Sequence, residues 1–405
     1  MIGPTTEPSK DKRSTEFDIH GVLGIRLVEP TSADVAAVTK QLGPLQRLLL
    51  REPDVTLRFV QHLPPPRLRH LGLKQKGCTG EAFFVLDEHT NGAMARIPFD
   101  LVGKPCEIVC ERGRGSVPLL MPILSLTALA KGFVAVHASA FVHHGTGILM
   151  AGWSGSGKTT ALLGFASKGA EFIGEEWVLL SGDGQMMCGL PRKIELSPSH
   201  LETVPDVRRA IKRQRRWAFE GLGHLARMQG ILGEKINGAF PASVLQRAIS
   251  AVQRRVLPKV SPQAIFGSRV DSLIAKPEKV FLLISHDDSC VEVRPTPPVE
   301  MARRIAHMAQ YEQIRFMEHY LAFKFAFPAV KNAFLEESPA YQYELLSRAL
   351  MAKETYTVWH PHPVNFSVLY EKIKPFCEST RNVQKEALCA GDAPTWTESP
   401  ARAFS

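Results

Sequence analysis

Cysteine is scarce in this chain, and its distribution excludes two common kinds of stabilisation. The seven cysteines among 405 residues are scattered, odd in number and never arranged as C-x-x-C. This pattern argues against a disulfide framework and against a zinc knuckle, and it fits a reducing compartment. The one close pair, Cys106 and Cys110, flanks a segment typical of a strand. We therefore expect two buried thiols there rather than two metal ligands.

Long hydrophobic runs are also missing. The most apolar run, 117–130, is bounded by Arg114 and Lys131 and is shorter than the roughly 20 residues that a bilayer span requires. It predicts a buried helix. The segment 1–17 is polar and has no hydrophobic region of the kind a signal peptide carries. We expect no membrane span and a cytoplasmic location, and no internal repeat is evident.

The overall composition is that of a soluble globular protein, with 22% charged and 44% apolar residues. A chain of 405 residues is long enough for two or three domains. Its net charge of +9 favours anionic partners, nucleotides among them, without choosing one.

The strongest motif lies at residues 152–160, which read G-W-S-G-S-G-K-T-T. An apolar run, 148–151, precedes it and a helix-compatible run, 161–166, follows, so the order is strand, glycine-rich loop, helix. This is the phosphate-binding P-loop pattern G-x-x-x-x-G-K-T. Lys158 is predicted to reach the β- and γ-phosphates of ATP, and Thr159 to place its hydroxyl on Mg²⁺. The residues predicted to bind the nucleotide are Gly152, Ser154, Gly155, Ser156, Gly157, Lys158, Thr159 and Thr160.

An acidic pair follows the motif. Residues 171–174 are typical of a short strand, and Glu175 and Glu176 come directly after it. A carboxylate at a strand end that faces a P-loop is placed to bind magnesium or to accept a proton. Upstream, His137 lies between two apolar stretches, a position that more often holds a structural histidine.

Taken together, these features resemble the catalytic domain of HPr kinase/phosphorylase, a bacterial protein-serine kinase. That family's P-loop fold is related to phosphoenolpyruvate carboxykinase. The shared frame covers residues 132–197: a histidine before the P-loop, G-x-S-G-x-G-K, a Lys-Gly segment at 168–169 and a paired carboxylate. The resemblance implies that Glu175 handles the proton of the acceptor hydroxyl, that Glu176 helps to hold the metal, and that His137 assists near the phosphate.

The chain departs from that family at four places. Its acidic pair is glutamate instead of aspartate, and Thr160 replaces a metal-binding glutamate. Ala170 stands where the family has a histidine, and the downstream I-R-G-x-G signature is missing. The resemblance therefore implies kinase or ATPase activity more than the reverse, phosphorylase reaction.

The fold class expected is α/β, with a P-loop kinase core, an N-terminal accessory α+β region and a helical insertion. Six of the residues in 208–216 are basic, and this predicted helix is a candidate to grip an acidic partner or to act as a solvated lid. The predicted segments are 1–15 disordered, 16–115 accessory domain, 116–204 first part of the core, 205–270 basic helical insertion, 271–377 core continuation with C-terminal helices, and 378–405 disordered. Within them we expect a helix from residue 32 to about 41, strands at 55–60, 279–284 and 355–359, a turn at 182–184, and helices at 300–308 and 312–327. Residues 290–293 are expected to pair with the strand at 279–284.

Three smaller sites complete the sequence predictions. Arg192 and Lys193 lie on an extended segment and are candidates to touch phosphate, although a solvated strand edge is the commoner outcome. Arg269 is a candidate phosphate clamp, with a plain surface arginine as the alternative. His360 and His362 are assigned to a loop, because no third metal ligand is near in sequence.

The function expected is ATP-dependent transfer of the γ-phosphoryl group to a hydroxyl, with Mg²⁺ as cofactor. The acceptor implied by the resemblance is a serine on a protein or peptide, and a small-molecule hydroxyl is the open alternative. The resemblance also implies a homo-oligomer, and nucleic acid is not expected because no reader motif accompanies the basic residues. The competing hypotheses are a nucleotide-gated binding module and an NTPase without phosphotransfer.

Overall fold

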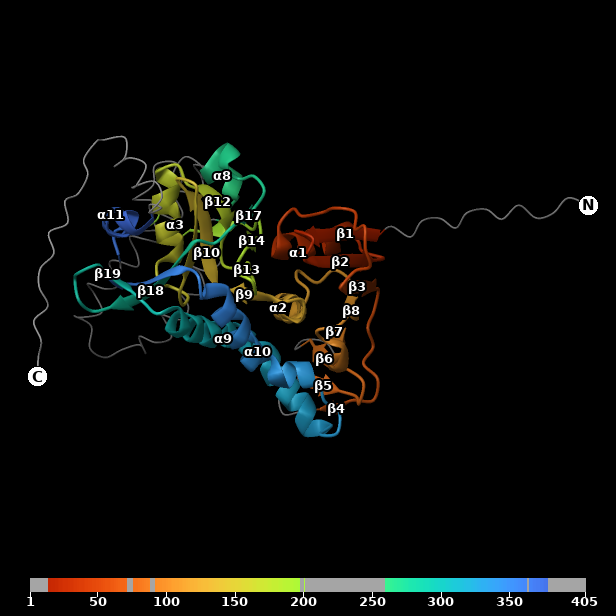
Figure 1. Cartoon of the computed structure of the whole chain (residues 1–405). Coiled ribbons are helices and arrows are strands. Elements are labelled where there is room, and N and C mark those ends of the chain that lie inside the picture. The colour runs from red at the N-terminus through yellow and green to blue at the C-terminus, as the bar shows by residue number, and fades with distance from the viewer. Residues whose placement is uncertain are drawn as a thin grey trace, which may run out of the picture.

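The computed structural model describes residues 14–70, 76–87, 92–196, 200, 259–362 and 364–377. This part of the chain is a mixed α/β structure with seven α-helices and sheets of eight, six, four and two strands. Figure 1 shows the eight-stranded sheet on one side of the molecule and the six-stranded sheet on the other. The α/β class expected from the sequence is confirmed at this level.

The N-terminal sheet is built around one parallel unit that antiparallel strands extend. Thr31 caps α1 (Ser32–Leu42) in a reciprocal box with Asp34, so the helix begins where the sequence predicted it. The strand order is β1-β2-β3-β8-β7-β6-β5-β4, with β2-β3 and β3-β8 parallel. The strands are β1 (Ser14–Ile19), β2 (Leu23–Val28), β3 (Val55–Val60), β4 (Arg69–His70), β5 (Lys76–Cys78), β6 (Phe83–Leu86), β7 (Ala93–Ile97) and β8 (Cys106–Glu111).

The six-stranded sheet carries the glycine-rich loop. Its order is β12-β10-β11-β18-β20-β19, and the central strands β11, β18 and β20 are parallel. The carboxyl ends of these three strands therefore meet at one edge, which is where ligands bind in sheets of this kind. The strands are β10 (Ala138–His143), β11 (Thr146–Ala151), β12 (Glu171–Gly174), β18 (Lys279–His286), β19 (Glu292–Pro295) and β20 (Glu354–Pro361).

Alternate residues of β11 face two different cores, because successive side chains in a strand point to opposite faces. Ile148 and Met150 pack in one cluster with α3 (Lys158–Ser167) and α11 (Phe366–Cys377). Leu149 and Ala151 belong to the larger cluster on the other face. Burial on both faces explains why β11 reads as a continuous apolar run.

A four-stranded antiparallel sheet backs this larger cluster. Its order is β17-β14-β13-β9, and β15 pairs separately with β16. The strands are β9 (Phe133–Val136), β13 (Val178–Ser181), β14 (Met187–Gly189), β15 (Ile194–Glu195), β16 (Lys259–Val260) and β17 (Ile274–Ala275). The turn predicted at residues 182–184 joins β13 to β14 as a hairpin.

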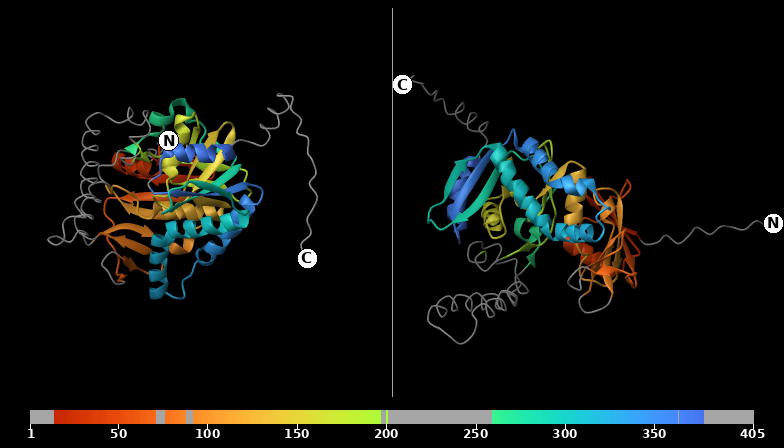
Figure 2. Two further views of the ribbon diagram at one scale, coloured as in Figure 1. Left: turned by 90° about the vertical axis from the view of Figure 1, so that its left-hand side faces the viewer. Right: turned by 90° about the horizontal axis from the view of Figure 1, so that it is seen from below.

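Helices α2 (Leu120–Ala130), α9 (Pro298–Ala326) and α10 (Ala333–Leu350) connect the two large sheets. The views of Figures 1 and 2 agree that α9 and α10 run from the six-stranded sheet to the N-terminal sheet.

Two local predictions were wrong. The helices expected at 300–308 and 312–327 form the single helix α9, and β19 pairs with β20 instead of β18. The buried apolar residues of α9, from Met301 to Phe323, all pack in the larger cluster, so a single core holds the helix along its length.

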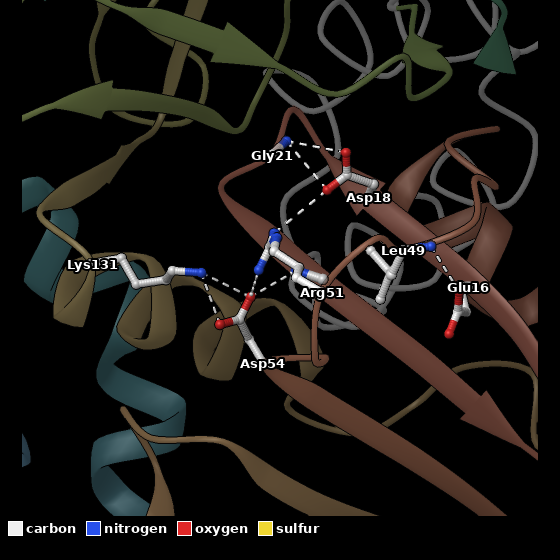
Figure 3. Close-up of polar contacts among 8 residues, drawn as sticks. Glu16, Asp18, Gly21, Leu49, Arg51, Asp54 and Lys131 are labelled. Atoms are coloured by element: carbon white, nitrogen blue, oxygen red, sulfur yellow. Dashed lines mark hydrogen bonds and ion pairs between the residues drawn. The ribbon is translucent and has the colours of Figure 1, made fainter.

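Polar contacts also fasten the N-terminal sheet to the core. Lys131, at the end of α2, donates to both carboxylate oxygens of Asp54 at 2.8 and 3.0 Å (Figure 3). Arg51 donates to Asp54 at 2.8 Å and lies 3.5 Å from Asp18, so one carboxylate gathers two cations. Hydrogen bonds from Lys131, Gly24 and Arg51 outweigh the effect of burial and lower the pKa of Asp54.

Asn332 is a buried polar residue that joins the start of α10 to the segment 99–102 of the N-terminal part. Its side-chain amide donates to the carbonyls of Phe99 and Val102 at 2.9 and 2.8 Å, and its Oδ1 accepts from Leu335 N at the start of α10. We expect Asn332→Ala to lower the free energy of unfolding by about 2–4 kcal/mol, because it removes a helix cap and leaves buried carbonyls unpaired. Urea unfolding measures the loss.

The exposed Asn365 offers a matched control, since its Oδ1 also caps backbone N–H groups, at 2.9 and 3.4 Å. Asn365→Ala should cost about 1 kcal/mol or less. Equal losses in the two variants would show that the buried carbonyl contacts of Asn332 add nothing.

The predicted segment boundaries relate to the described elements as follows. Ser14 and Thr15 belong to β1, although 1–15 was expected to be disordered. The basic residues 208–216 and the tail 378–405 lie outside the described residues. The end of the predicted insertion, 259–270, contains β16, α8 (Pro262–Phe266) and the short 3-10 helix η2 (Gly267–Arg269), and Phe266 packs on Phe172 of β12.

The cysteine and membrane predictions can be examined in the same residues. Cys106 and Cys110 are buried in β8, as expected, and burial raises the pKa of each thiol to about 12. Within the described segments, no helix combines the length and apolarity needed to cross a bilayer.

Candidate functional site

The glycine-rich loop, residues 152–157, joins the end of β11 to the start of α3. Gly155 and Gly157 have φ of +85° and +83°, values that a residue with a side chain rarely adopts. A Cβ on Gly152 would lie 2.3 Å from the Ser156 hydroxyl and 2.9 Å from the Leu283 carbonyl. Glycine is therefore required at these turns, while Ser154 lies exposed on the outer part of the loop.

Lys158 is the first residue of α3 and folds back over the loop. Its Nζ donates to the carbonyls of Gly152 and Trp153 at 2.7 and 2.6 Å, and the residue is only 5% exposed. Burial lowers the pKa of the Lys158 ammonium to about 8, against the opposing effect of Glu175. The charges of Glu175, Glu312 and Glu176 all act on this ammonium.

Thr159 and Glu175, which the sequence predicted for neighbouring roles, are in direct contact. Thr159 Oγ1 donates to Glu175 Oε1 at 2.6 Å. Glu175 follows the end of β12 and is 7% exposed. Burial, reinforced by the charge of Glu176, raises the pKa of Glu175 to about 7. A buried carboxyl with a pKa near neutrality is suited to accept a proton.

Glu176 lies beside this pair but faces outward. Its φ is +65°, an uncommon value for a residue with a side chain, in the tight turn where Trp177 N donates to the Glu175 carbonyl. Its carboxylate is 44% exposed and lies 3.4 Å from Arg192 Nη1. Of the two basic residues predicted to touch phosphate, Arg192 is thus at the acidic pair, whereas Lys193 is exposed.

His137 is placed next to the loop by strand pairing. It immediately precedes β10, whose first residue, Ala138, pairs with Ala151 at the end of β11. Its Nδ1 lies 2.6 Å from Glu312 Oε1 on α9. That contact and the neighbouring charges of His137 and Lys158 lower the pKa of Glu312, so this carboxylate is ionised at neutral pH. Sequence reasoning missed Glu312, since nothing within α9 distinguishes it from a solvated glutamate.

His360 is the second residue that sequence reasoning missed. It was assigned to a loop, but it lies in β20 and is completely buried. Its Nε2 lies 2.9 Å from the Ser156 carbonyl oxygen of the glycine-rich loop. The available signal was its position at the end of a predicted strand, because the ends of parallel strands converge.

Three other residues from the sequence predictions or the loop itself have contacts of their own. Trp153, 50% exposed, contacts the equally exposed Tyr311 of α9 edge to face, with ring centroids 4.5 Å apart. Thr160 Oγ1 lies 3.1 Å from His200 Nε2. Arg269, the predicted phosphate clamp, instead donates to the carbonyls of residues 166 and 170 at 2.8 Å each, where α3 ends. That helix is about 15 Å long, so Arg269 lies far from the loop.

At the carboxyl edge of the six-stranded sheet, the start of α3, a buried cation (Lys158) and a buried carboxyl with a pKa near 7 (Glu175) lie together. A helix start offers free N–H groups of the kind that bind anions. Comparison with known proteins adds no assignment: no protein-family model matches the chain, and no curated protein sequence matches it.

Proposed function

We propose that this protein is an ATP-dependent phosphotransferase of the HPr kinase type, which transfers the γ-phosphoryl group to a hydroxyl. The observation that carries the proposal is the 2.6 Å hydrogen bond from Thr159, in the glycine-rich motif, to the buried Glu175. A phosphate loop alone binds nucleotide. A buried carboxyl beside its hydroxyl adds a group that can take a proton where the transferred phosphoryl group arrives.

Each residue has a separate role in the proposed reaction. The loop N–H groups and the start of α3 bind the phosphates, and Lys158 contributes its positive charge to the γ-phosphoryl group. The bond between the γ-phosphorus and the ADP oxygen breaks while a bond to the acceptor oxygen forms. The acceptor's proton passes to the Glu175 carboxylate. Glu312 holds His137 by its Nδ1, which orients the imidazole beside the loop.

The oxygens at this site fit magnesium. Mg²⁺ prefers hard oxygen ligands and is usually held by one or two protein groups together with substrate phosphates. The Thr159 hydroxyl and the Glu175 carboxylate lie together, and Glu176 is adjacent in sequence. Mg²⁺ bound with the nucleotide supplies positive charge that offsets the charge developing on the transferred group. The sequence prediction used Thr159 and Glu176 as the metal ligands, and in this proposal Glu175, which accepts from Thr159, remains the proton acceptor.

One contact favours a second candidate function, a nucleotide-gated binding module. Thr160, the residue after the motif, lies 3.1 Å from His200, which precedes the basic residues 208–216 in the sequence. Nucleotide binding at Thr159 would then influence a segment that carries many arginines without any phosphotransfer.

The experiment that tests the proposal is transfer of label from γ-labelled ATP. Purified protein is incubated with Mg²⁺ and bacterial lysate, separated into protein, peptide and small-molecule fractions, with a parallel sample in excess chelator. Label on a discrete species, lost with the chelator, supports the kinase and identifies its acceptor. ATP binding without transfer to any fraction would favour the binding module, and release of free phosphate alone would favour an NTPase.

The pH dependence of kcat/KM is a separate prediction. Transfer requires ionised Glu175 and charged Lys158, whose pKa values are about 7 and about 8. The rate should rise as pH passes 7 and fall above 8, giving a narrow bell in the free enzyme. A profile measured from about pH 5 to 10 checks this. The residual activity of Glu175→Gln should keep the descending limb and lose the ascending one. An unchanged ascending limb would assign the proton acceptor elsewhere.

A further inference from the structure

The glycine-rich loop is contacted on its sheet side by His360, which lies 204 positions after Ser156 in the chain. His360 occupies the carboxyl end of β20, where Ser285 of β18 is its pairing partner. It is 0% exposed, and its Nε2 lies 2.9 Å from the Ser156 carbonyl oxygen. In the tautomer protonated at Nε2, this nitrogen donates to the Ser156 carbonyl, which can only accept.

The ring has little freedom to make any other contact. Its Nδ1 lies 2.8 Å from the Pro361 carbonyl oxygen. On the loop side, a Cβ added to Gly157 would lie 3.4 Å from the ring's Cε1, so the imidazole packs directly beneath the Ser156–Gly157 peptide. A neutral imidazole has one N–H, so the Nε2–H tautomer makes its hydrogen bond to the loop, and complete burial keeps the ring in place.

The direction of this hydrogen bond has a consequence for phosphate binding. The Ser156 carbonyl and the Gly157 N–H belong to one peptide group, and in a trans peptide they point in opposite directions. When His360 draws the carbonyl down toward β20, the Gly157 N–H turns away from the sheet, toward the outer face of the loop. Gly157 accepts this orientation because its φ is +83°.

We infer that His360 is a positioning residue for phosphate binding: its hydrogen bond to Ser156 orients the Gly157 N–H as a donor to the nucleotide's phosphates. This inference deepens the proposed function and rests on it for the identity of the ligand. Preorganised backbone donors cost no reorganisation when the anion arrives, which is why their orientation affects affinity.

Three variants separate the hydrogen bond from simple packing. His360→Leu removes the donor while keeping an apolar side chain of similar size. His360→Gln places an amide N–H at the same number of bonds from the backbone, so it can still reach the Ser156 carbonyl. His143→Leu is the matched control, because His143 is also buried, in β10, but pairs with Thr146 at the end of β10 and β11 away from the loop.

The primary measurement is the affinity for ATP, ADP and AMP by calorimetry. We expect His360→Leu to weaken ATP and ADP binding about tenfold, because the Gly157 N–H is then no longer held as a donor to the charged phosphates. The affinity for AMP should fall much less, because its single phosphate makes fewer contacts with the loop. His360→Gln should bind ATP and ADP with an affinity within about threefold of that of the wild type. His143→Leu should bind them as tightly as the wild type does. Equal affinity of wild type and His360→Leu for ADP would overturn the inference.

A second measurement does not depend on nucleotide. Amide hydrogen exchange, followed by mass spectrometry on a peptide spanning 152–160, should be faster in His360→Leu and unchanged in His360→Gln and His143→Leu. A protein that binds ATP but transfers nothing would defeat the phosphotransferase proposal and leave the role of His360 intact. Unchanged exchange in His360→Leu would defeat the role of His360 whatever the transfer assay shows.

Discussion

Substitution of Lys158 by Met is expected to lower phosphotransfer by at least about 10²–10³-fold and to weaken ATP binding. The ammonium is the only buried cation in the described part of the glycine-rich motif, and its Nζ already lies 2.7 and 2.6 Å from loop carbonyls. Met keeps the aliphatic packing of the side chain and removes only the charge and its donors. Transfer of label from γ-labelled ATP and calorimetric titration with ATP measure the two losses.

The fold of this variant should be at least as stable as that of the wild type. Burial lowers the pKa of Lys158 to about 8, which means that the folded state disfavours its charge. A neutral side chain avoids this penalty. Functional sites commonly keep such a buried charge at some cost in the stability of the fold. Lys40→Met, on the exposed side of α1, controls for the loss of a lysine as such. Full transfer activity in Lys158→Met would remove the glycine-rich motif from the mechanism.

Replacing Glu175 by Gln should reduce transfer by about 10²–10⁴-fold with little change in ATP affinity. The amide oxygen of Gln can still accept the hydrogen bond from Thr159, so the loop keeps its geometry. What the variant loses is the ability to take a proton. Single-turnover transfer measured beside ATP binding separates the two effects. Parallel loss of ATP binding would contradict the role assigned to Glu175.

The same variant should show a pH-dependent gain in stability. The pKa of Glu175 is raised from its ordinary value of 4.5 to about 7 in the folded state, so ionising this buried carboxyl destabilises the folded protein as pH rises between these values. Glu175→Gln should therefore melt at a higher temperature than the wild type at pH 8 and at nearly the same temperature at pH 4. Such a gain would also show that lost activity does not come from unfolding.

Glu176→Gln is the informative comparison for this site. Its carboxylate is 44% exposed and lies 3.4 Å from Arg192, so its removal should cost little stability. We expect it to raise the Mg²⁺ concentration needed for transfer and to reduce the maximal rate less than Glu175→Gln does. A larger loss in Glu176→Gln would exchange the two roles.

The sequence was most informative where the signal was local. The strand, loop and helix around residues 146–167 could be predicted because glycine spacing and apolar runs act within a few residues of each other. The strand β3 matched its predicted bounds for the same reason. The strand that ends before Glu175 brings that residue to the loop, which the spacing of the motif and the acidic pair had already indicated.

Contacts between distant parts of the chain could not be predicted in this way. Nothing in the residues around 360 indicates which strand pairs with β20, and only that pairing brings His360 under the loop. Glu312 reaches His137 because α9 crosses the core without interruption, although the sequence had been divided into two helices there. Pairing register and helix trajectory depend on the whole core, which a window of a dozen residues does not contain.

The position of β20 in its sheet also has a consequence for how the protein is made. β20 lies between β18 and β19, yet it is the last strand of that sheet to leave the ribosome. The N-terminal sheet can assemble while the rest is being synthesised, but the loop at residues 152–157 waits for the support at residue 360. A nascent chain of 350 residues would contain every letter of the glycine-rich motif and still lack the strand that anchors it. The glycine-rich loop thus gains this support only after β20 has been synthesised.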